Sequence, residues 1–117
     1  MLYIAGPMTG HHEFNYPAFR VAADALTRAG YTVAHTGSLA ALSFLTATGT
    51  APKPADAYPH TYYLRHALAM LLECDSVALL PGWEASRGAR VEVDVAHALG
   101  MTCLPVDVWI RQAYLSE

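Results

Sequence analysis

A carboxylate in the second half of the chain has a spacing that suits chemistry on a sugar. Glu92 follows Ser86 by six residues, in the stretch SRGARVE. We expect a helix to begin near Arg87, where free backbone N–H groups attract an anion such as phosphate and Ser86 and Arg87 add side-chain donors. A carboxylate less than two turns away could act as base, acid or nucleophile at an anomeric carbon. The alternatives are a solvent-exposed Glu92 and a Ser86 that only caps the helix.

Two glycine-bearing turns are expected beside this carboxylate. One begins at Gly6 and the other at Pro81, and each follows an apolar run that reads as a strand. Parallel sheets bind ligands outside the carboxyl ends of their strands, so both turns should lie on one rim. The candidate substrate-binding residues are Gly6, Pro7, Met8, Thr9, Gly10, Gly82, Trp83, Ser86, Arg87 and Gly88.

Tyr3 is the other candidate catalytic residue. It lies in an apolar run three residues before Gly6, so its hydroxyl could reach the same pocket or could hydrogen-bond to backbone as a buried structural tyrosine. The six histidines show no metal-ligand spacing with a third ligand. We therefore expect no metal site. No cofactor is expected either.

The hydrophobic pattern predicts strands alternating with helices around a small parallel sheet. The expected strands are Leu2–Ala5, Tyr31–Ala34, Ser76–Leu80 and Thr102–Val106, and the expected helices are Pro17–Gly30, Tyr62–Glu73 and Arg87–Leu99. Val91–Val95 alternates like a strand, but a helix is predicted there because a strand has just ended and a glycine stop follows. Pro105 indicates the end or the edge of the sheet.

The composition fits one soluble domain spanning residues 1–117. Of the 117 residues 54% are hydrophobic and 15% charged, and the net charge of −3 argues against a nucleic-acid polymer as partner. No apolar run approaches a membrane span, no signal peptide is evident and both cysteines read as reduced, so we expect a cytoplasmic protein without a membrane partner. Residues 35–60 are either a flexible insertion or a lid over the site.

Three stretches carry a family resemblance: LYIAGPMTG, FNYPAF and CDSVALLPGWEASRGARVEVDVAHALG, about half of the chain. They resemble the nucleoside 2-deoxyribosyltransferase superfamily, in particular its small branch similar to 2′-deoxynucleoside 5′-phosphate N-hydrolases. The resemblance implies a flavodoxin-like three-layer α/β sandwich with four to five parallel strands, a homodimer or larger homo-oligomer, and cleavage of an N-glycosidic bond in a nucleoside or nucleotide.

The resemblance also implies roles for individual residues. Glu92 would be the nucleophile that forms a glycosyl-enzyme intermediate, which water or a second base resolves, and Tyr3 would position it. The turn from Gly6 to Gly10 would lie against the sugar or its 5′ group. We also expect the helix N-terminus to help keep Glu92 ionised.

Three positions refine this expectation. The family's Asp that assists the leaving base is Ala67 here, so His66, Asp56 or another residue takes that role, or the protein binds nucleotides without turnover. Thr9 stands where phosphate-binding relatives can carry Arg. Ser86 matches the nucleotide hydrolases, whereas the nucleoside transferases have Asp, so we expect a 5′-monophosphate to be preferred. NAD glycohydrolysis, which breaks the same type of bond, is a third alternative.

Overall fold

The computed structural model describes residues 1–7, 15–35 and 60–115. Within them four strands form one sheet in which every neighbouring pair is parallel, in the order β2-β1-β3-β4. The strands are β1 (Leu2–Ala5), β2 (Val33–His35), β3 (Ser76–Leu79) and β4 (Thr102–Pro105). This is the order of the first four strands of a flavodoxin-like sheet. The predicted fold class, a single-domain α/β sandwich with a parallel sheet, is therefore confirmed.

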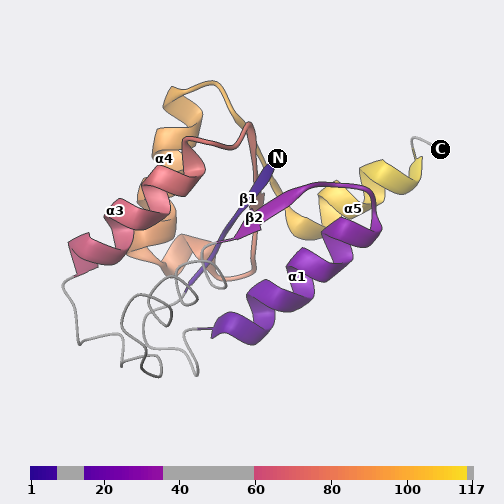
Figure 1. Cartoon of the computed structure of the whole chain (residues 1–117), viewed down its shortest axis with the longest axis horizontal. Helices are drawn as coiled ribbons and strands as arrows, with labels where there is room; N and C mark the ends of the chain where they lie inside the picture. The colour runs from indigo at the N-terminus through magenta and orange to yellow at the C-terminus, as the bar shows by residue number, and fades with distance from the viewer. Residues whose placement is uncertain (8–14, 36–59, 116–117) are drawn as a thin grey trace.

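Helices cover both faces of the sheet (Figure 1). They are α1 (Tyr16–Arg28), α3 (His60–Leu71), α4 (Arg87–Ala98) and α5 (Val106–Leu115), with a short 3₁₀ helix η3 (Trp83–Ala85) before α4. Figure 1 shows α3 and α4 on one side of the strands and α1 and α5 on the other. Two separate clusters of buried side chains lie between the layers, one under α3 and α4 and one under α1 and α5.

The buried faces of α1 and α4 explain why these segments are helical. In α1 the buried residues are Phe19, Ala22, Ala23 and Leu26, the spacing predicted from the sequence. In α4 they are Ala89, Glu92, Val93 and Ala96, which also recur at helical spacing. The alternation within Val91–Val95 is therefore a coincidence of composition, and the helix predicted there is confirmed.

The C-terminal helix α5 was not predicted. The last strand ends at Pro105 on the edge of the sheet, one residue earlier than expected, and α5 follows it directly. The indole Nε1 of Trp109 donates a hydrogen bond to the carbonyl of Val77 at 2.9 Å, and the Tyr31 hydroxyl donates to the carbonyl of Trp109 at 2.8 Å. These two bonds attach α5 to the sheet and to the loop after α1.

Some expectations concern residues outside the described ranges. Met8, Thr9, Gly10 and Asp56 belong to this group, as does nearly all of the segment 35–60 interpreted as a loop or lid. No helix of the described ranges is long and apolar enough to cross a membrane.

Candidate active site

Tyr3 and Glu92 meet between the sheet and α4. Tyr3 is the second residue of β1 and is fully buried, and Glu92 lies in the second turn of α4 with 5% of its surface exposed. The Tyr3 hydroxyl donates a hydrogen bond to Oε2 of Glu92. Within the part of the chain that the structure describes, Glu92 is the only charged residue that is buried. The two candidate catalytic residues are thus in direct contact.

Burial dominates the electrostatics of Glu92. Loss of solvent raises the pKa of its carboxyl group from 4.5 to about 7, and the hydrogen bond from Tyr3 acts in the opposite direction. The expectation that the helix N-terminus keeps this group ionised is wrong in its net effect, because Glu92 is the sixth residue of α4 and the dipole acts mainly within the first turn. The carboxyl group is therefore able to exchange a proton near neutral pH.

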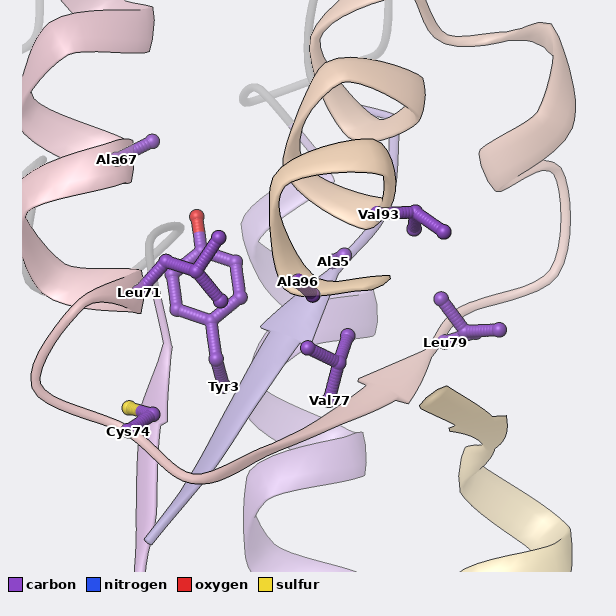
Figure 2. Close-up of a cluster of buried hydrophobic side chains, with 9 residues drawn as sticks. All are labelled: Tyr3, Ala5, Ala67, Leu71, Cys74, Val77, Leu79, Val93 and Ala96. Atoms are coloured by element: carbon purple, nitrogen blue, oxygen red, sulfur yellow. The ribbon is translucent and has the colours of Figure 1, made fainter. Parts of the chain in front are cut away.

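The surroundings of Tyr3 are apolar. Figure 2 shows the Tyr3 ring within the cluster under α3 and α4, with its hydroxyl pointing toward the side where Ala67 lies and away from Cys74. Ala67 itself is 7% exposed and belongs to this cluster. The position at which the resembling family carries an acid is therefore filled here by a buried methyl group beside Tyr3.

Gly6 and Pro7, the described residues of the first glycine turn, lie beside the second turn at the carboxyl edge of the sheet, as predicted. The amide of Leu80 donates to the carbonyl of Ala5 at 2.9 Å, and a Cβ added at Gly6 would lie 2.7 Å from Cβ of Leu80. At Gly82, where φ is +87°, an added Cβ would be 3.6 Å from Cγ of Pro7. Only glycine permits the approach at Gly6, and the positive φ favours glycine at Gly82.

Ser86 is the N-cap residue of α4. Its Oγ accepts a hydrogen bond from the amide of Ala89 at 3.2 Å, which leaves the hydroxyl proton available for donation. Arg87, the first residue of α4, is exposed, and Gly88 is half-buried. Trp83 is half-buried and packs against the cluster that contains Tyr3. These residues join the second glycine turn to the helix that carries Glu92.

His66, one of the two candidate substitute acids, is exposed on α3, whereas its neighbour Ala67 faces the Tyr3 cluster. Successive residues of a helix point about 100° apart, so these two side chains face different ways. In the described part of the chain, no group of three or more His, Cys, Asp and Glu side chains is placed to hold a metal ion.

Asn15 is a residue of the site that the sequence analysis missed. Its side-chain Nδ2 donates a hydrogen bond to the carbonyl of Pro7 at 2.9 Å, which ties the start of α1 to the first glycine turn. The sequence signal was an asparagine directly before the Tyr16-Pro17 entry of a predicted helix.

A large apolar groove lies on the opposite face of the sheet. It has a volume of about 1010 Å³ and runs between α1 and α5, where Val21 and Ile110 line it. Gly82 and Trp83 form part of its wall, but Tyr3 and Glu92 do not. We place the chemistry at Tyr3 and Glu92 because the groove offers apolar surface without a buried reactive group.

A comparison with protein families matches most of the chain. The model of a domain of unknown function, DUF4406, matches residues 1–104, from before β1 into β4. The matched span contains both Tyr3 and Glu92. No curated protein gave a significant match to the chain.

Proposed function

We propose that this chain, which belongs to the DUF4406 family, acts on the N-glycosidic bond of a 2′-deoxynucleoside 5′-monophosphate or nucleoside. It cleaves this bond, or transfers the sugar to a second base, through a covalent glycosyl-Glu92 intermediate. The observation that carries the proposal is the buried hydrogen bond from the Tyr3 hydroxyl to Glu92. It holds a carboxyl group of near-neutral pKa between the helix that follows the Gly82 turn and the strand that leads into Gly6, and these two turns approach each other at the carboxyl edge of the sheet. The resemblance of the sequence to the nucleoside 2-deoxyribosyltransferase superfamily supplies the reaction type.

The proposed reaction proceeds in two displacements. A carboxylate oxygen of ionised Glu92 bonds to C1′ of the deoxyribose as the C1′–N bond breaks, and the base leaves with the electron pair of that bond. Water, or a second base in a transfer, then bonds to C1′ as the bond from C1′ to the Glu92 oxygen breaks, and Glu92 is released as a carboxylate. The attacking water or base loses one proton, which balances the proton that the departed base takes up. Tyr3 donates to the carboxylate in the free protein and thereby favours its ionised, nucleophilic form.

A 5′-phosphate is proposed to bind at the start of α4. The hydroxyl of Ser86 has a proton to donate, Arg87 adds a cation on the first helical residue, and the helix N-terminus favours an anion. A carboxylate at position 86 would repel the phosphate instead. Ser86→Asp should therefore erase or invert a preference of the protein for the phosphorylated substrate.

The second candidate function is nucleotide binding without turnover, and Ala67 is the observation that favours it. A methyl group cannot protonate a leaving base, and Ala67 is buried in an apolar cluster beside Tyr3. A protein with this arrangement could recognise a nucleotide with the same turns and leave its glycosidic bond intact, as a sensor would.

One experiment separates these functions. Wild type and Glu92→Gln are incubated with the 2′-deoxynucleosides, their 5′-monophosphates and NAD, and free base or nicotinamide is measured by chromatography alongside a thermal-shift screen. Base released from a deoxynucleotide by wild type and not by Glu92→Gln supports the glycosidase. Stabilisation without release favours the binding protein, and release of nicotinamide alone favours NAD glycohydrolysis. Base release by Glu92→Gln at the wild-type rate would refute the mechanism.

We also propose that the protein is cytoplasmic and that it self-associates there. The chain is short and 54% hydrophobic, and a small domain buries a lower fraction of its surface than a large one. Large hydrophobic side chains that remain more than half exposed include Val21, Leu72, Leu99, Tyr114 and Leu115. A second copy of the chain would remove part of this surface from water, so we propose a homodimer or a larger homo-oligomer.

A further inference from the structure

Asn15 has a conformation that its own helix does not explain. It occupies the N-cap position of α1 with φ 65° and ψ 19°, in the left-handed region. It is the only non-glycine residue with a positive φ among residues 1–7, 15–35 and 60–115. Asparagine tolerates this region better than most residues, but an N-cap residue normally has extended backbone.

The side chain of Asn15 also departs from the usual N-cap role. An N-cap asparagine ordinarily accepts a hydrogen bond from a backbone amide of the first helical turn, and Asn15 makes no such bond. Its amide nitrogen instead donates to the carbonyl of Pro7, eight residues earlier. Ser86 gives an internal comparison, because it caps α4 with extended backbone and accepts from Ala89 in the ordinary way.

The position of Pro7 explains why the Asn15 side chain donates to its carbonyl. Pro7 is buried in the first glycine turn, and its ring stands against Gly82 of the second turn. The preceding Gly6 is in turn closely packed against Leu80, the residue that follows β3. A hydrogen bond to the Pro7 carbonyl therefore holds three elements together at the carboxyl edge: the end of β1, the turn that leads to α4, and the start of α1.

We infer that Asn15 is a positioning residue that fixes the Gly6-Pro7 turn against the Gly82 turn, so that the substrate-binding edge keeps its shape. This inference rests on the proposed function for the identity of the substrate. In this role Asn15 does not contact the reacting atoms. It acts through the backbone of Pro7.

Two substitutions remove the hydrogen bond from Asn15 to Pro7 and leave the backbone conformation of residue 15 accessible. Asn15→Gly accepts a positive φ and removes the amide, and Asn15→Asp keeps the shape but presents an acceptor to the Pro7 carbonyl. The matched control is Asp24→Gly, which weakens the exposed middle of the same helix and does not touch Pro7.

The kinetic test measures base release from the deoxynucleoside 5′-monophosphate that wild type cleaves best. We expect kcat/KM to fall about 10- to 100-fold in both Asn15 variants, mainly through a higher KM, because small displacements of a binding element can cost that much. Asp24→Gly should lower the melting temperature with wild-type KM. Asn15 variants that lose stability and keep the wild-type KM would show a merely structural role and overturn the inference.

A second measurement is independent of activity. Asn15 is the only asparagine of the chain and Gln112 the only glutamine, so the side-chain amides are few and readily assigned in a ¹⁵N spectrum of the full protein. We expect a scalar coupling across the hydrogen bond from the Asn15 amide to the Pro7 carbonyl carbon, and its absence would overturn the inference. Wild type that neither binds nor cleaves any deoxynucleotide would defeat the proposed function and the positioning role with it. An active wild type with unaffected Asn15 variants would defeat the positioning role alone.

Discussion

Replacing Glu92 by Gln should stabilise the protein at pH 8 and have little effect at pH 5. Glutamine keeps the size of the side chain and can still accept the hydrogen bond from Tyr3, but it carries no charge. Glu92 has 5% of its surface exposed, and the pKa of its carboxyl group rises from 4.5 to about 7 on folding. The ionised form is therefore the one that the folded state disfavours.

The sign and size of the effect follow from proton linkage. Between pH 4.5 and about 7 the folded state binds more protons at Glu92 than the unfolded state, so the contribution of Glu92 to stability falls as the pH rises through this window. Each pKa unit is worth about 1.4 kcal/mol, which gives a loss of about 3 kcal/mol above pH 7. The Gln variant does not have this loss, so its melting temperature at pH 8 should exceed that of wild type by about 10 °C.

The assay is urea or thermal unfolding of wild type and Glu92→Gln at several pH values, and the relevant quantity is the difference between the two proteins. Titration of all other groups cancels in this difference. Glu84→Gln removes the same charge from an exposed site, and we expect it to change stability by no more than about 0.5 kcal/mol. A Gln variant no more stable than wild type at pH 8, or a difference that does not vary with pH, would refute the electrostatic reasoning.

Further outcomes follow from the same contacts. Tyr3→Phe removes the donor that favours ionised Glu92, so the pKa of that carboxyl group should rise further and the acid limb of the pH–rate profile should move to higher pH; an unchanged midpoint would contradict this. Gly6→Ala would put Cβ 2.7 Å from Cβ of Leu80 and should lower the free energy of unfolding by about 1–3 kcal/mol, measured with urea, and wild-type stability would disprove the close approach. Ala67→Asp should speed base release by about 10²–10⁴-fold while lowering stability, because the new carboxyl group enters an apolar cluster; an unchanged rate beside an active wild type would mean that another acid already supplies the proton. Light scattering at micromolar concentration should report a dimer or larger species, and a 12.6 kDa monomer would exclude the proposed self-association.

Much of the fold could be predicted because its elements are local and strongly patterned. The run Leu2–Ala5 is buried on both sides, so it reads directly as a strand of a parallel sheet. For α4 the order of elements was a better guide than the alternation within Val91–Val95. The helix α5 was missed because no turn residue separates it from β4, although Val106, Trp109 and Ile110 already had helical spacing.

The candidate site was predictable only where its geometry lies within one element. Ser86 and Glu92 share a helix, so their separation could be read from the sequence. The contact between Tyr3 and Glu92 joins residues 89 positions apart, and only packing of α4 on β1 creates it. The direction of the Glu92 pKa shift depends on that burial, so an argument from helix position alone gave the wrong sign. Asn15 was missed because sequence does not show whether an N-cap amide will accept or donate.

Mass spectrometry of the protein, quenched in acid during turnover of a 2′-deoxynucleoside 5′-monophosphate, tests directly whether Glu92 is the nucleophile. We expect a fraction of wild-type protein to be heavier by one deoxyribosyl 5-phosphate group, located on the peptide that contains Glu92, and no such species in Glu92→Gln. Base release by wild type with no adduct on Glu92, or with an adduct on another residue, would contradict the claim that this carboxylate is the nucleophile.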